Sequence, residues 1–138
     1  MVSKTPLSRS VIVENVASAT VEVAEGILSE LKLRDFGEDA TFAVHLALVE
    51  AFWNALTHGN KMDPGKKIKI DYAIDGDKVE VSIADDGGGF DPSAVPDPRY
   101  GENLYRPGGR GLFLIRSYMD EVRFNDSGNC VHMVRYKR

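Results

Sequence analysis

The chain has 138 residues, 43% of them hydrophobic and 28% charged, a composition typical of one globular domain with its own core. Its 17 basic and 21 acidic residues give a net charge of −4 without any dense basic run, so we expect no direct nucleic-acid partner. No signal-peptide pattern and no run of about eighteen apolar residues is present, so we expect a cytoplasmic protein without membrane contact. The single Cys130 excludes an internal disulfide.

The first half of the chain predicts a strand followed by two helices. Residues 1–8 are expected to form a flexible tail, and near-alternating valines predict a strand over about 9–16. Apolar residues at helical spacing predict a helix that ends near Leu33. A second helix is expected over about 38–57, with Gly59 as its stop. The residues expected to be buried on this second helix are Phe42, Leu46, Val49 and Trp53.

The second half predicts two hairpins, one loop and one helix. The loop, about 91–107, holds four of the six prolines, and the helix is expected over about 111–119. The expected strands are 67–74, 78–84, 121–125 and 131–136. This mixture indicates an α+β fold, a two-layer sandwich with a mixed, mostly antiparallel sheet and helices on one face. Residues 9–138 are expected to form a single domain.

Three polar residues recur at a spacing of four near the end of the second helix. Glu50, Asn54 and His58 would lie on one face of an α-helix. They could simply be the polar surface of an amphipathic helix, but Asn has poor helix propensity and this segment is largely apolar. An amide oxygen is a reasonable ligand for Mg²⁺ when phosphates and waters complete the octahedron.

Two glycine clusters follow. Asp85 ends a predicted strand and leads into Gly87 and Gly89, where the carboxylate could either form an ordinary turn or accept a hydrogen bond from an exocyclic amine such as that of adenine. A second cluster, Gly108 to Gly111, precedes a predicted helix and is either a flexible loop or an anion site at the helix N-terminus. No P-loop, dinucleotide-binding or ordinary protein-kinase motif is present.

Taken in order, these motifs resemble those of a known family. Glu50-x₃-Asn54-Ala55-x₂-His58, Asp85-x-Gly87-x-Gly89 and Gly109-x-Gly111 are similar to the N, G1 and G2 boxes of GHKL-type (histidine-kinase-like) ATPase domains. Within this group, the short single-domain form resembles the bacterial anti-sigma factor serine/threonine-protein kinases. The likeness runs from the first strand to the C-terminus, with Gly88 as an extra glycine in the second motif.

The resemblance implies a role for each motif. Glu50 is implied as the general base on the accepting hydroxyl, Asn54 as the Mg²⁺ ligand, and Asp85 as the group that binds the adenine amine. Residues 91–107 are implied as an ATP lid. The further nucleotide-binding candidates are His58, which either caps the helix or lines the site, Gly87, Gly89, Arg106, Gly108, Gly109, Arg110, Gly111 and Leu112.

These expectations favour a kinase over two other functions. The implied enzyme uses ATP and Mg²⁺ to phosphorylate a small antagonist protein, and it sequesters a sigma factor, with a homodimer as a compatible assembly. An ATP-dependent binding module without phosphotransfer is the alternative, but such a module needs no base at Glu50. The catalytic part of a sensor histidine kinase would need an upstream phosphoacceptor histidine, and residues 1–44 contain none.

Overall fold

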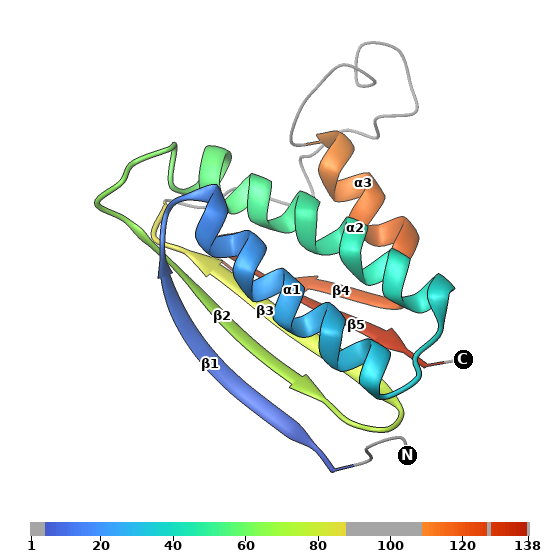
Figure 1. Cartoon of the computed structure of the whole chain (residues 1–138). Coiled ribbons are helices and arrows are strands. Elements are labelled where there is room, and N and C mark those ends of the chain that lie inside the picture. The colour runs from blue at the N-terminus through green and yellow to red at the C-terminus, as the bar shows by residue number, and fades with distance from the viewer. Residues whose placement is uncertain (1–4, 88–108, 127, 138) are drawn as a thin grey trace.

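The computed structural model describes residues 5–87, 109–126 and 128–137, which form a sheet with helices on one of its faces (Figure 1). The elements are β1 (Leu7–Glu14), α1 (Ala17–Leu33), α2 (Glu38–Asn54), η1 (Ala55–Gly59), β2 (Lys67–Ile74), β3 (Lys78–Asp85), α3 (Gly109–Tyr118), β4 (Glu121–Phe124) and β5 (Cys130–Tyr136). The strand order is β1-β2-β3-β5-β4, and every pairing among the described strands is antiparallel. The predicted α+β sandwich is thus confirmed.

Strand β1 begins earlier than the sequence pattern suggests. It occupies Leu7–Glu14, because its register with β2 runs from the pair Leu7 and Ile74 to the pair Glu14 and Lys67. Leu7 and Ser8 therefore belong to the sheet and not to a tail, which is a correction to the expected boundary at residue 9.

The hairpin between β2 and β3 follows from local hydrogen bonding. One carboxylate oxygen of Asp75 accepts the backbone N–H groups of Asp77 at 2.7 Å and Lys78 at 2.9 Å. An Asp side chain that binds backbone groups two and three residues ahead closes a turn without help from the rest of the fold. The short range of this interaction explains why the hairpin is visible in the sequence.

Helix α2 buries a different face from the one expected. Phe42, Val49 and Trp53 are 57%, 48% and 51% exposed, and Leu46 is only half-buried. The buried residues of α2 are Ala40, Ala43, Val44, Ala47, Leu48, Ala51 and Phe52. The prediction was wrong because α2 is apolar almost all round, so periodicity alone cannot select a face. The many buried alanines bring the helix close to its neighbours.

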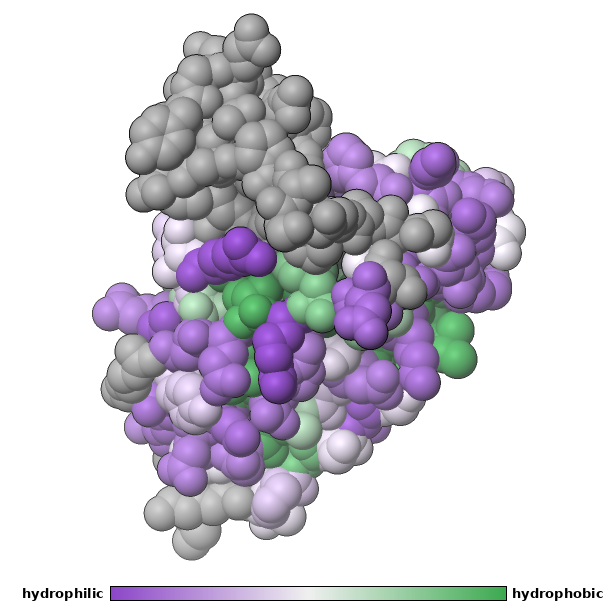
Figure 2. All heavy atoms as spheres, turned by 180° about the vertical axis from the view of Figure 1, so that it is seen from behind, coloured by the Kyte–Doolittle hydropathy of each residue, from purple (hydrophilic) through white to green (hydrophobic). Residues whose placement is uncertain are grey.

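The segment Glu38–Gly59 is long and apolar enough to cross a membrane by length and composition. Half of its most apolar eighteen-residue stretch is nevertheless buried inside the fold, as in the core helix of a soluble protein. The opposite face of the sheet, which none of the described helices covers, is largely hydrophilic (Figure 2). Its surface includes Ser10, Asp71, Glu80 and His132.

Candidate nucleotide-binding site

Glu50 and Asn54 lie one turn apart on α2, between its buried face and its exposed face. Both side chains are half-buried, whereas Ala51 is buried and Trp53 is exposed. Neither polar side chain forms a hydrogen bond or ion pair with the part of the chain that the structure describes. A carboxylate and an amide that are partly removed from water and lack protein partners are available to a ligand.

The helix does not end as a regular α-helix. Its last turn, η1, is a π-helix, in which the backbone N–H of Asn60 donates to the carbonyl of Ala55 at 2.8 Å. Such wide turns occur mostly as single turns within α-helices and are frequently found at functional sites. His58 lies on this turn, four residues after Asn54, and its side chain is exposed, whereas those of Glu50 and Asn54 are half-buried.

The end of η1 packs directly against the end of β3. A Cβ atom added to Gly59 would overlap the carboxylate of Asp85, and one added to Gly87 would overlap the carbonyl oxygen of Gly59. The helix does end at Gly59, but this glycine has no positive φ. Gly59 is needed because the Asp85 side chain occupies the space that a larger residue would fill.

Asp85 is held in place through one oxygen only. Its Oδ1 accepts the backbone N–H of Gly87 at 2.8 Å, while Oδ2 accepts no hydrogen bond within the described residues. Burial raises the pKa of this carboxyl, and the nearby Asp86 raises it further, whereas the Gly87 N–H and Lys66 lower it. A half-buried carboxylate oxygen with free lone pairs can accept a hydrogen bond from a ligand amine.

A buried asparagine that the sequence did not single out connects three segments around Asp85. Asn60 is fully buried, and its Nδ2 donates to the Asn15 side chain at 3.0 Å and to the Lys67 carbonyl at 2.9 Å. Its Oδ1 accepts the backbone N–H of Asp86 at 2.8 Å. Asn15 donates in turn to the carbonyl of Asp63 at 3.2 Å. This network fixes the turn that carries Asp85.

No spacing rule could have found this network, because Asn15 and Asn60 are 45 residues apart. The network joins the residue that follows η1 to the start of β2 and to the connection between β1 and α1. The only hint in the sequence is the position of Asn60 directly after Gly59.

The second glycine cluster lies partly in helix α3. Gly109 and Gly111 fall in the first turn of this helix, which begins two residues earlier than expected. The first N–H groups of a helix lack partners within it and suit an anion. The proposed lid at 91–107 and the candidates Gly89, Arg106 and Gly108 lie outside the described residues, as do the side chains of Arg110 and Leu112.

Two other reactive side chains do not belong to this arrangement. His45 is exposed on α2, away from its buried face. Burial raises the pKa of the half-buried Cys130 thiol, which disfavours the reactive thiolate. Among the described residues, no group of three or more His, Cys, Asp and Glu side chains could hold a metal ion.

The geometry agrees with the comparison to known protein families. The model of the histidine kinase-like ATPase domain matches residues 13–135. The chain belongs to this family. The ATPase is also 34% identical over 108 residues to the serine-protein kinase RsbW of Listeria monocytogenes, covering 73% of this chain and 69% of that one. It is 35% identical over 98 residues to the serine-protein kinase RsbW of Bacillus subtilis, covering 66% and 61% of the two chains.

A solved structure has the same fold. The crystal structure of the RsbU and RsbW domains of a Mycobacterium tuberculosis protein superimposes with a TM-score of 0.58 and 18% identity, over 97% of this ATPase and 32% of that chain. The resemblance to the anti-sigma factor kinases is therefore confirmed at the level of the family. This ATPase is a member of the serine-protein kinase branch and thus an ATP-dependent protein kinase.

Proposed function

We propose that this kinase uses ATP and Mg²⁺ to phosphorylate a serine or threonine of a small antagonist protein in the cytoplasm, and that it sequesters a sigma factor. The observation that carries this proposal is the pair Glu50 and Asn54. These side chains are half-buried, one turn apart and without partners among the described residues. A regulatory module that only bound ATP would have no use for such a carboxylate.

Asp85 binds the base in this proposal. Its free Oδ2 accepts a hydrogen bond from the exocyclic amine of adenine, and Gly59 and Gly87 leave room for the carboxylate and its turn. Guanine presents a carbonyl at the equivalent position, so the same oxygen would meet an acceptor. The site should therefore select ATP over GTP.

Asn54 holds the metal in this proposal. Its amide oxygen supplies one ligand to Mg²⁺, while phosphate oxygens and water supply the others, since no acidic cluster exists among the described residues. When bound, the ion neutralises charge on the phosphates during transfer. The first turn of α3, with Gly109 and Gly111, offers backbone N–H groups to the same phosphates.

Glu50 acts as the general base. It accepts the proton of the incoming hydroxyl as the hydroxyl oxygen bonds to the γ-phosphorus and the bond to the ADP oxygen breaks. The products are a phosphoserine or phosphothreonine on the antagonist, ADP, and a proton that Glu50 releases to water. His58, Gly89, Arg106, Gly108, Arg110 and Leu112 are proposed as further nucleotide contacts on the strength of their motifs.

The test is incubation of the full chain with radiolabelled ATP, Mg²⁺ and candidate antagonist proteins from the same genome. Label should appear on a serine or threonine of one candidate and should disappear when Mg²⁺ is chelated. If the chain binds a candidate in an ATP-dependent manner yet never labels it, the alternative of a binding module is correct. Sedimentation of the same sample tests the predicted homodimer.

A further inference from the structure

Helix α2 presents a continuous apolar line to its surroundings. Phe42, Leu46, Val49 and Trp53 follow one another at intervals of four, three and four residues, which places them on one face of the helix. Three of them are about half exposed or more, and Leu46 is half-buried. We call these four residues the α2 stripe. Eleven residue steps of a helix make it roughly 16 Å long.

The neighbouring helix α1 has no comparable row of exposed apolar side chains. On α1 the exposed positions include Glu22, Glu25 and Lys32, as expected for a helix that faces water. The large apolar residues exposed on α1, Val21 and Leu33, stand apart toward opposite ends of the helix. Isolated exposed apolar residues need no explanation, whereas an aligned row with two aromatics is typical of an interaction surface.

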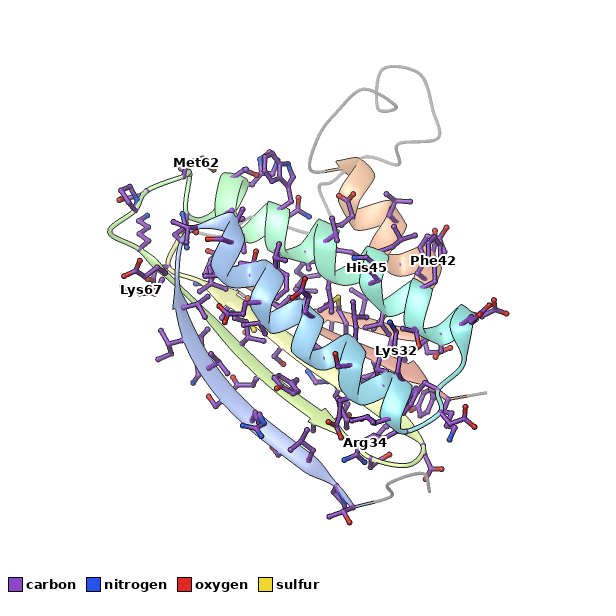
Figure 3. All side chains as sticks on the ribbon, in the orientation of Figure 1. Lys32, Arg34, Phe42, His45, Met62 and Lys67 are labelled. Atoms are coloured by element: carbon purple, nitrogen blue, oxygen red, sulfur yellow. The ribbon has the colours of Figure 1, made fainter. Side chains whose placement is uncertain are left out.

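The α2 stripe is continuous with the catalytic residues. Glu50 is four residues after Leu46 and three before Trp53, spacings at which side chains are neighbours on a helix surface. At the other end, the ring of Phe42 meets the ring of Tyr118 edge-on, with centroids 6.4 Å apart. Phe42 therefore lies where α2 meets the end of α3, far along the helix from the site (Figure 3).

We infer that the α2 stripe is the docking surface for the protein substrate, which covers it with an apolar patch beside the phosphoacceptor residue. The inference rests on the proposed function. A serine on a folded protein can reach Glu50 only if the surface around that serine lies against the neighbouring part of α2. All four side chains of the stripe are apolar, so the part of the partner that covers them is apolar. Trp and other aromatic residues at the centre of a contact supply most of its affinity.

The test uses the full chain and the antagonist that the wild type phosphorylates. Trp53→Ser and Phe42→Ser should each raise the KM for the antagonist, by about tenfold or more for Trp53, while the KM for ATP stays unchanged. The Phe42 variant is decisive because this residue is twelve positions from Asn54. Leu33→Ser on α1 removes an equally exposed apolar side chain and should leave both KM values unchanged. Thermal melts confirm that each variant is folded.

Contrary results separate this inference from the proposed function. If the wild type is active and both stripe variants keep its KM for the antagonist, the docking inference is overturned and the kinase assignment stands. If sedimentation instead shows that the stripe variants convert a dimer to a monomer with that KM unchanged, a second copy of the chain covers the stripe. If the wild type labels no candidate antagonist at all, the proposed function fails and the docking inference falls with it.

Discussion

Helices α1 and α2 lie side by side on the same face of the sheet, yet their sequences follow opposite rules (Figure 1). Helix α1 turns charged residues outward and buries Ile27 and Leu31, and its buried Thr20 donates to the Ala17 carbonyl at 2.7 Å. Helix α2 buries alanines, exposes large apolar side chains, and leaves Glu50 and Asn54 half-buried without partners among the described residues.

Folding alone explains the sequence of α1 but not that of α2. Local rules of burial and hydrogen bonding tend to be broken where a protein performs its function. Matched substitutions on the two helices therefore test the comparison. On α2 and the adjoining η1 they should change activity or ligand binding, and on α1 they should change stability at most.

The largest expected effect is on phosphotransfer. Glu50→Gln preserves size and much of the hydrogen bonding but removes the proposed base, so the rate should fall roughly 10²–10⁴-fold while ATP binding is retained. Glu25→Gln makes the same change on the exposed surface of α1 and should have no effect on the rate. Initial rates with radiolabelled ATP and calorimetry measure the two properties. Loss of ATP binding in the Glu50 variant would assign that residue a structural role.

A pair of glycine substitutions sharpens the comparison next. Gly59→Ala places a methyl group against the Asp85 carboxylate, which must move, and ATP affinity should fall on the order of 100-fold. Gly26→Ala on α1 meets no atom within 4 Å and should raise the free energy of unfolding by about 0.5–1 kcal/mol. Calorimetry and urea denaturation of both variants provide the measurements. Unchanged ATP affinity in Gly59→Ala would separate η1 from the nucleotide site.

An effect of similar size is expected from a change to the carboxylate itself. Asp85→Asn should weaken ATP binding by about 1.5–3 kcal/mol, the contribution of one hydrogen bond to a charged group. The same variant should discriminate less well between ATP and GTP. Equal affinity of the wild type for the two nucleotides would contradict the role of Asp85 in base recognition.

The pH dependence of binding tests the same residue. Burial raises the pKa of Asp85 above its usual value, so ATP binding should weaken as the pH falls through that raised pKa. The free energy of unfolding should depend on pH in the opposite direction. Because the folded state raises the pKa of Asp85, it favours the protonated carboxyl, and ionisation of Asp85 as the pH rises therefore lowers the free energy of unfolding. In Asp85→Asn, the ATP affinity and the free energy of unfolding should each vary less with pH. Calorimetry and thermal melts between mildly acidic and neutral pH measure the two quantities.

The smallest change is expected in the free energy of unfolding. Asn60→Ala leaves the buried partners of this side chain unsatisfied and should lower the free energy of unfolding by about 1–3 kcal/mol. Ser29→Ala on the exposed side of α1 should change it by less than about 0.5 kcal/mol. Urea denaturation compares the two. An Asn60 variant as stable as the wild type would show that water replaces the lost hydrogen bonds.

The elements of the fold could be predicted because their signals are local. The turn at Asp75 and the helix break at Asp35 and Gly37, which both have positive φ, depend on neighbouring residues only. The strand bounds were accordingly right to within about two residues. The buried face of α2 was not predictable, because both of its faces are apolar and only the position of the sheet selects between them.

The candidate site was predictable in its motifs but not in its assembly. Glu50 and Asn54 are neighbours on one helix, so their spacing alone indicates their proximity. The contact between Gly59 and Asp85 joins the end of a helix to the end of a strand, and Asn60 reaches back to Asn15. Contacts of this range depend on the complete topology, which a spacing rule does not contain.

The Asn60 network has a consequence for how the protein behaves as ATP levels change. Because it ties the β1–α1 junction, the start of β2 and the turn after β3 to one side chain, the Asp85 carboxylate, which we propose to bind the base, is in place only in the native state. A nucleotide that binds only the native state stabilises it by mass action, by about 2.7 kcal/mol when its concentration is a hundred times Kd. The stability of the kinase should therefore depend on the ATP concentration in the cell. Starvation would then lower the amount of folded kinase as well as the concentration of its phosphate donor.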